Sequence, residues 1–73
     1  MIVFSAHAVQ RIRARKISRL LVVETIKHPQ KIISGNRGRK LRQRKFGDKI
    51  LEVITITEGS DIIIVTQYWL EEG

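Results

Sequence analysis

The sequence predicts an α+β fold in which two N-terminal helices pack on one face of an antiparallel sheet of about four strands. Two observations support this prediction. Residues before Pro29 show capping residues followed by apolar positions at helical spacing, whereas residues after Gln30 form short β-branched runs separated by turn residues. Because the chain has 73 residues, we expect residues 1–73 to form a single domain with one modest core.

Two helices are expected in the first third of the chain. Met1 to Phe4 is a short apolar segment that favours β structure, and Ser5 is suited to cap a helix that runs to about Lys16. Ser18 is placed to cap a second helix, which Pro29 terminates.

The strands follow in four segments joined by turns. They are predicted over Lys31 to Ser34, Arg39 to Phe46, Lys49 to Thr57 and Ile62 to Leu70. Gly47 and Asp48 fit a tight hairpin turn between two of them. The strand that begins at Lys49 is apolar on both faces, which is typical of a strand at the centre of a sheet.

The last predicted strand carries two candidate site residues. A period of two places one set of side chains on one face: Ile62, Ile64, Thr66, Tyr68 and Leu70. The polar hydroxyls of Thr66 and Tyr68 would therefore emerge together at the end of an apolar strand. The alternative is that β-propensity alone explains both residues.

Charge is distributed unevenly along the chain. All 14 Lys and Arg residues lie between Arg11 and Lys49, and the net charge is +7. The densest run contains no acid and comprises Arg37, Arg39, Lys40, Arg42, Arg44 and Lys45. A nucleic-acid phosphate backbone is the expected counter-surface. An ordinary basic surface, a charged strand edge that prevents aggregation, and a docking strip for an acidic protein remain alternatives.

Composition argues against several classes of protein. The chain has no cysteine, and its histidines and carboxylates do not group at metal-ligand spacing, so we expect no metal or other cofactor. The apolar runs are far shorter than the roughly 20 residues needed to cross a bilayer. We therefore expect a soluble, cytoplasmic protein with no membrane partner, as a monomer or a homodimer.

A row of three residues gives the clearest functional signal. His7, Arg11 and Arg15 are spaced four residues apart, so the first predicted helix would bring them to one side. One titratable imidazole and two permanent cations suit the binding of an anion, the transfer of a proton, or both. The structural alternative is that His7 ties the helix to the sheet while the arginines pair with carboxylates.

In the segment from Phe4 to Ser18, Ala8 directly follows His7, and Arg11 and Arg15 follow His7 at steps of four residues. This pattern resembles a known family. With Gly47 to Val53 and the closing Ile63 to Tyr68 segment, it is similar to the family designated domain of unknown function 4258. That family is similar in layout to RelE-like toxins and other metal-independent ribonucleases. Lys16 stands where the family commonly has a glycine between its helices.

This resemblance implies a ribonuclease-like toxin of a toxin–antitoxin system, which would act on free or ribosome-bound RNA. His7 would then be the acid or base and Arg11 the phosphate clamp, with hydrogen bonds from Thr66 or Tyr68. Arg15 and the basic run from Arg37 to Lys45 would bind the flanking RNA. An acidic antitoxin protein is the implied partner. A non-catalytic nucleic-acid-binding module and a small protein that docks an acidic partner are the alternative functions.

Overall fold

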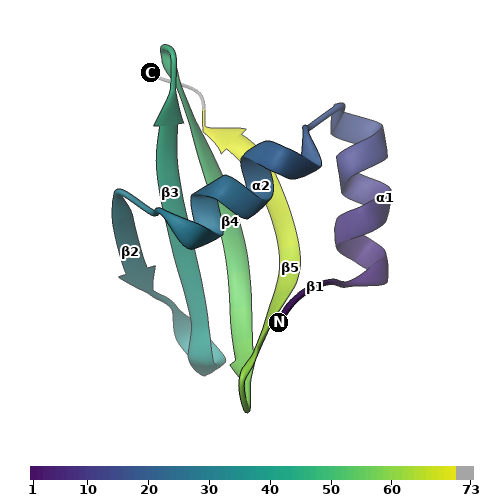
Figure 1. Ribbon diagram of the computed structural model, residues 1–73, viewed down its shortest axis with the longest axis vertical. Coiled ribbons are helices and arrows are strands. Elements are labelled where there is room, and N and C mark those ends of the chain that lie inside the picture. The colour runs from purple at the N-terminus through teal and green to yellow at the C-terminus, as the bar shows by residue number, and fades with distance from the viewer. Residues whose placement is uncertain (71–73) are drawn as a thin grey trace.

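The structure is a computed structural model that describes residues 1–70. In chain order the elements are β1 (Ile2–Phe4), α1 (Ala6–Arg15), α2 (Arg19–Lys27), β2 (Lys31–Ser34), a 3₁₀ turn (Asn36–Gly38), β3 (Arg39–Phe46), β4 (Lys49–Glu58) and β5 (Asp61–Leu70). Both N-terminal helices pack against the sheet, with α2 lying across the strands and α1 beside β5 (Figure 1). The predicted α+β class and the two N-terminal helices are confirmed.

The predicted strand count and the purely antiparallel arrangement are wrong. Within residues 1–70 the sheet has five strands in the order β1-β5-β4-β3-β2. β1 pairs in parallel with β5, from Ile2 opposite Ile62 to Phe4 opposite Ile64. Met1 to Phe4 favours β structure in sequence, but a three-residue strand shows no recognisable alternation and its partner lies about 60 residues away in the chain, so its pairing was not predicted. The other pairings are antiparallel, and β4 is the central strand, as its apolar sequence predicted.

The ends of α1 explain both a predicted cap and the unusual lysine that follows the helix. The Ser5 Oγ accepts a hydrogen bond from the Ala8 backbone N–H at 3.1 Å, which confirms the predicted N-cap. Lys16 ends the helix with φ 52° and ψ 45°, a left-handed conformation that glycine adopts most easily. Lys16 therefore occupies a backbone position at which glycine would be favoured.

The core lies between the helices and one face of the sheet. It is formed by seven buried apolar residues: Ala8, Ile17, Val22, Ile26, Leu51, Val53 and Ile64. Phe46 and Trp69 meet edge to face, with ring centroids 6.2 Å apart, and pack against this cluster. Within residues 1–70 neither helix is long and apolar enough to cross a membrane.

The two faces of the sheet are identified by contacts with α2. The Arg42 guanidinium donates to the carbonyl of Ile26 in α2 and to Thr55 Oγ1, so Arg42 and Thr55 lie on the helix-covered face. Because side chains alternate along a strand, Glu52 and Ile54 lie on the opposite face. No helix covers that face in the part of the chain described, and we call it the open face.

A bulge in β5 changes which side chains share a face. The pairing register shifts between Ile54 and Thr55, which lie opposite Thr66 and Ile64, respectively, so Val65 is the extra residue. Beyond the bulge, Gln67 and Trp69 continue the helix-covered face, whereas Thr66 and Tyr68 lie on the open face. The prediction that Ile62 and Ile64 share a face with Thr66 and Tyr68 is therefore wrong.

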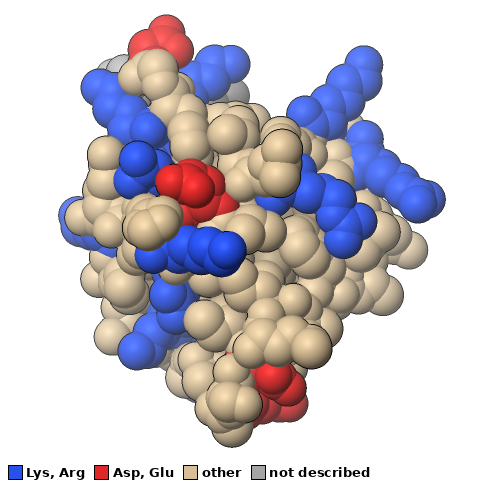
Figure 2. All heavy atoms as spheres, viewed as in Figure 1, with Lys and Arg blue, Asp and Glu red and all other residues tan. Residues whose placement is uncertain are grey.

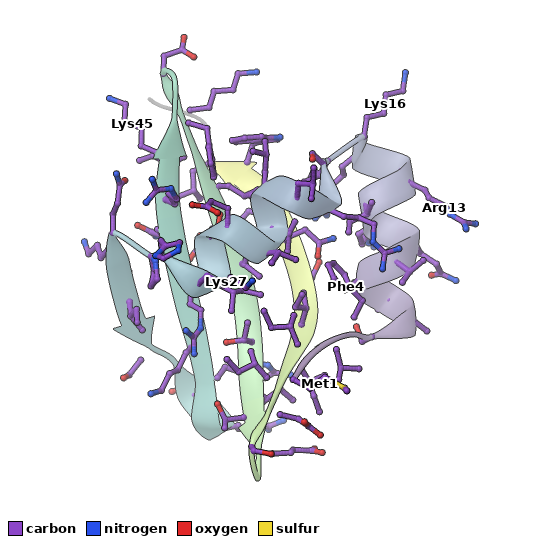
Figure 3. All side chains as sticks on the ribbon, viewed as in Figure 1. Met1, Phe4, Arg13, Lys16, Lys27 and Lys45 are labelled. Carbon is purple, nitrogen blue, oxygen red and sulfur yellow. The ribbon has the colours of Figure 1, made fainter. Side chains whose placement is uncertain are left out.

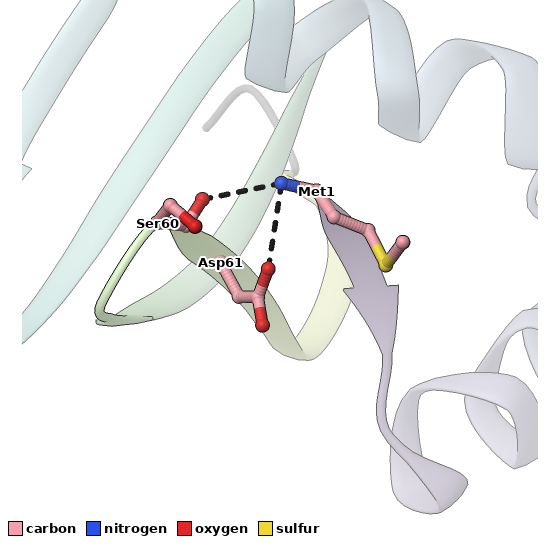
Figure 4. A network of polar contacts seen from close by, with 3 residues as sticks. All are labelled: Met1, Ser60 and Asp61. Atoms are coloured by element: carbon pink, nitrogen blue, oxygen red, sulfur yellow. Dashed lines mark hydrogen bonds and ion pairs between the residues drawn. The ribbon is translucent and has the colours of Figure 1, made fainter.

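Polar contacts join the start of the chain to the turn between β4 and β5 (Figure 4). The amino group of Met1 donates to the Ser60 carbonyl at 3.1 Å and lies 3.5 Å from an Asp61 carboxylate oxygen. The Ile62 N–H also donates to the Met1 carbonyl at 2.8 Å. These contacts hold β1 in register with β5 and so help to place the start of α1.

Candidate functional site

Helix α1 lies along the edge of β5 beyond the point at which β1 ends. The Ser5 backbone N–H donates to the Ile64 carbonyl at 3.2 Å, and the Ser5 hydroxyl donates to the Val65 carbonyl at 3.3 Å. Ten residues later, Arg15 Nη1 donates to the Gln67 carbonyl at 2.8 Å. The helix therefore runs along the edge of β5 in the direction of the strand.

His7, Arg11 and Arg15 form a row on one flank of α1. Each step of four residues advances about 6 Å along the helix and turns about 40° around it, so the row spirals slightly. Arg15 is the member of the row that binds β5, and all three side chains are exposed. The Arg11 Nε–H donates to His7 Nε2 at 3.4 Å, so these two residues form one cluster.

In the described part of the chain, the arginines of this row do not pair with carboxylates. Within residues 1–70 the one ion pair joins the Met1 amino group to Asp61. The predicted structural alternative, in which Arg11 and Arg15 form salt bridges with strand carboxylates, is therefore not seen in the described chain. The Arg15 guanidinium has a structural role at the edge of β5. Over residues 1–70 the one hydrogen bond of the Arg11 side chain is to the imidazole of His7.

A second cluster forms around Tyr68. The Arg15 guanidinium carbon lies 5.8 Å from the centroid of the Tyr68 ring. Across the ladder Tyr68 is opposite Glu52, whose side chain is only 4% exposed. Partial burial raises the pKa of Tyr68 above its ordinary 10.0, and the Glu52 carboxylate adds to this effect through its charge and a hydrogen bond, while Arg15 opposes it.

The site residues predicted on α1 and β5 are thus divided between two clusters, the second of which also contains Glu52. His7 and Arg15 are eight residues apart in α1, which corresponds to about 12 Å along the helix. His7 and Arg11 form the first cluster, and Arg15, Tyr68 and Glu52 form the second. Thr66 is half-buried on the open face, between the levels at which Ser5 and Arg15 bind the edge of β5.

The basic run of β3 does not form one continuous surface. Arg42 and Arg44 lie on the helix-covered face and bind the end of α2: Arg44 Nη1 donates to the His28 carbonyl at 2.8 Å, and Arg42 Nη1 donates to the Ile26 carbonyl at 3.5 Å. Cations at a helix C-terminus stabilise its exposed carbonyls. These two arginines therefore have a structural role that the sequence did not reveal.

The other cations of the run remain exposed but point in different directions. Arg39 and Lys45 lie on the open face, Lys40 lies on the helix-covered face, and Arg37 occupies the 3₁₀ turn with φ 59°. β3 is two strands from β5, or about 10 Å across the sheet. Viewed from the helix side, Lys and Arg gather in two groups at opposite sides of the molecule (Figure 2).

Glu52 is the site residue that sequence reasoning missed. Its signal was a lone acid within the apolar strand from Lys49 to Thr57, but only the pairing register shows that it lies between Gln43 and Tyr68. Within residues 1–70 no three His, Cys, Asp or Glu side chains gather in a way that could hold a metal ion. The chemistry that the side chains of the site offer is anion binding, hydrogen bonding and proton transfer.

Comparison with known proteins gives one match. No curated protein and no solved structure matches the chain significantly. The family described as domain of unknown function DUF4258 matches residues 4–69, which include both clusters and nearly all of the fold. The chain therefore belongs to the DUF4258 family.

Proposed function

We propose that this protein binds RNA and cleaves it without a metal ion, as a RelE-like ribonuclease toxin does. The observation that carries this proposal is the exposed pair formed by His7 and Arg11, with Arg15 one turn further along the same flank of α1. An imidazole in contact with a guanidinium combines a proton-transfer group with a phosphate-binding group. The net charge of +7 favours a polyanionic substrate.

The proposed reaction is attack of a ribose 2′-hydroxyl on the neighbouring phosphate. The bond from phosphorus to the 2′-oxygen forms and the bond to the 5′-oxygen breaks, so one proton must leave the nucleophile and another must reach the leaving oxygen. His7 transfers one of these protons, water at this exposed flank of α1 takes up or supplies the other, and Arg11 stabilises the charge on the phosphorane oxygens. Thr66 is the hydroxyl suited to donate to the same phosphate. It lies on β5 between the residue that Ser5 binds and the residue that Arg15 binds.

Substrate binding would also change the contact between the two residues of the first cluster. In the free protein the Arg11 Nε–H approaches the lone pair of His7 Nε2. A phosphate is a stronger acceptor for a guanidinium than a neutral imidazole. Arg11 would therefore turn toward the substrate and leave the Nε2 lone pair of His7 free to accept a proton.

The proposal is tested by RNA integrity after expression of the wild type and of two histidine variants. His7→Ala should abolish growth arrest and RNA cleavage, whereas His28→Ala should preserve both, because the exposed His28 side chain lies at the end of α2. The two variants remove the same chemical group from different places. Intact RNA after incubation with folded wild-type protein, free of any acidic antitoxin, would contradict the proposed cleavage.

A non-catalytic RNA-binding function is the second candidate. It is favoured by the two-cluster geometry, in which Arg15 and Tyr68 are well separated from His7. In that case salt-sensitive binding should survive His7→Ala. Reversal of charge at Arg42 and Arg44 would be a poor test because both residues bind α2, so the appropriate substitutions are at Arg39 and Lys45, which face the open side of the sheet.

A further inference from the structure

The pairing register places a row of polar side chains across the open face. Lys31 is opposite Gln43, Gln43 is opposite Glu52, and Glu52 is opposite Tyr68. Arg15 extends the row beyond β5 through its contact with the Tyr68 ring. The row thus crosses four strands, about 14 Å, and has a cation at each end.

A parallel row of mainly apolar side chains lies two residues along the strands. It is formed by Ile33, Leu41, Ile54 and Thr66, which are paired in that order. Two residues of strand separate the rows by about 7 Å. Ile33 is 37% exposed, and Leu41 and Ile54 are half-buried although no described helix covers them. The open face therefore offers an apolar strip beside a polar strip.

Glu52 is the unusual member of the polar row. Its carboxylate is nearly buried, and within residues 1–70 it forms no ion pair. Burial of a carboxylate without a cationic partner is unfavourable, so such groups are enriched at functional sites. Gln43 and Tyr68 flank it on either side, which gives the row amide, carboxylate and phenol groups in sequence.

We propose that the open face binds an unpaired nucleobase of RNA, with the ring on the strip of Leu41 and Ile54 and its polar edge against Gln43 and Glu52. A nucleobase has apolar faces and a hydrogen-bonding edge, which matches the two adjacent strips. The cations at the ends of the polar row, Arg15 and Lys31, suit the flanking phosphates. This inference rests on the proposed RNA binding and adds a site for base recognition.

The carboxylate of Glu52 determines which base is favoured. An ionised carboxylate only accepts hydrogen bonds, so it favours an edge that presents N–H donors. Guanine presents two neighbouring donors on its Watson–Crick edge, N1–H and the N2 amino group, whereas uracil presents one N–H between two carbonyl oxygens. The geometry therefore favours guanine and disfavours uracil.

Binding is measured with short 2′-O-methyl RNA oligonucleotides, which lack the 2′-hydroxyl nucleophile. A uridine oligonucleotide with one central guanosine is compared with the all-uridine oligonucleotide by fluorescence anisotropy. Wild-type protein should bind the guanosine oligonucleotide about tenfold more tightly. Glu52→Gln should reduce this preference to about twofold or less, whereas Glu58→Gln, an exposed acid on the same strand, should preserve it.

Equal affinity of the wild type for both oligonucleotides, or a full preference in the folded Glu52→Gln variant, would overturn the inference. If Glu52→Gln does not fold, the backbone amide NMR chemical shifts of the wild type are compared with and without the guanosine oligonucleotide. Shift changes at Gln43 and Glu52 would support base binding on the open face. Shift changes confined to α1 would overturn it. A second copy or an acidic protein that covers this face and is not displaced by RNA would also overturn it.

The outcomes for catalysis and for base recognition are separable. Base-selective binding of the uncleavable oligonucleotide together with intact natural RNA would leave the open-face site supported and the proposed cleavage contradicted. Cleavage that depends on His7 but shows no preference for guanosine would leave the proposed function supported and overturn the inference about Glu52.

Discussion

Individual residues acquire their roles here from what the fold places beside them. Tyr68 was identified from sequence as a polar residue on an apolar strand, but its neighbours Arg15 and Glu52 come from α1 and β4. The phenol lies between a cation on one side and a nearly buried carboxylate on the other. Its ionisation therefore reports on the second cluster as a whole.

The phenol of Tyr68 should titrate above its ordinary pKa of 10.0 because partial burial and Glu52 both oppose the phenolate. The raised pKa stabilises the folded state below about pH 10, and this contribution is lost as the pH rises through the folded-state pKa. Tyr68 is the single tyrosine of the chain, so ultraviolet difference spectroscopy reads it directly.

Glu52→Gln provides the control for this titration. It removes the negative charge that opposes the phenolate, so the pKa of Tyr68 should fall toward its ordinary value, while the distant Glu58→Gln should leave it unchanged. An identical titration of Tyr68 in the wild type and in Glu52→Gln would show that the two groups do not interact.

The sequence predicted the chemistry of the first cluster better than that of the second. Helical spacing is enough to bring His7 and Arg11 together, because both lie on one element. The second cluster depends on pairing between strands and on the position of α1 along β5. These long-range features cannot be obtained from local periodicity, so Glu52 was missed and Arg42 and Arg44 were assigned to RNA.

Among the elements, α1 has the greatest influence on the site, and the N-cap serines of α1 and α2 behave differently. Ser5 accepts a capping hydrogen bond and also binds β5, whereas Ser18 precedes α2 without a side-chain cap bond. Ser5→Ala should therefore lower the free energy of unfolding by about 1–2 kcal/mol. Ser18→Ala should lower it by less than about 0.5 kcal/mol.

Urea denaturation followed by circular dichroism measures both serine variants. Equal losses in the two variants would contradict the view that the Ser5 contacts fix α1 on the sheet. A large loss in Ser18→Ala alone would contradict it more strongly, because that side chain makes no capping bond.

The arginines of β3 stabilise α2, and Arg42 offers a direct test. Arg42→Met keeps an unbranched apolar stem but removes the hydrogen bonds to Thr55 and Ile26, so it should lower the free energy of unfolding by about 1–2 kcal/mol. Lys40→Met is the matched control: this exposed side chain lies on the same face and forms no hydrogen bond or ion pair within residues 1–70. Denaturant unfolding that shows no difference between the variants would return Arg42 to the set of candidate RNA contacts.

The element predictions succeeded where the signal was local. Capping at Ser5, termination of α2 before Pro29 and the Gly47 hairpin, which has φ 65°, all depend on neighbouring residues. β1 and the bulge at Val65 depend on partners far away in the chain. The bulge reverses the alternation of side chains along β5. The prediction assumed a constant period of two and therefore placed Ile62 and Ile64 on the same face as Thr66 and Tyr68, which is wrong.

For the whole molecule, charge and fold together decide where an anion would bind. The chain carries 14 cations, but the fold directs two of them to α2 and spreads others over both faces and both edges of the sheet. The flank of α1 and the open face beside it remain as the surface on which an imidazole, cations and a row of hydrogen-bonding groups meet. We therefore propose that RNA phosphate binds this flank.

Arg13 provides a matched control for that claim because it lies on the same helix, about 200° around the axis from Arg11. Its side chain extends away from the rest of the molecule, whereas Lys45 lies near the opposite edge of the sheet (Figure 3). Arg11 and Arg13 carry the same charge and lie on the same helix. The alanine variants should therefore lose the same amount of non-specific attraction to RNA.

The most direct measurement is the affinity of Arg11→Ala and Arg13→Ala for an uncleavable RNA oligonucleotide over a series of salt concentrations. Arg11→Ala should weaken binding about fivefold to tenfold and reduce the slope of log affinity against log salt by about 0.7, the value for one lost phosphate contact. Arg13→Ala should remain within about twofold of the wild type. Equal losses in the two variants, or no loss in Arg11→Ala, would contradict a phosphate site on this flank of α1.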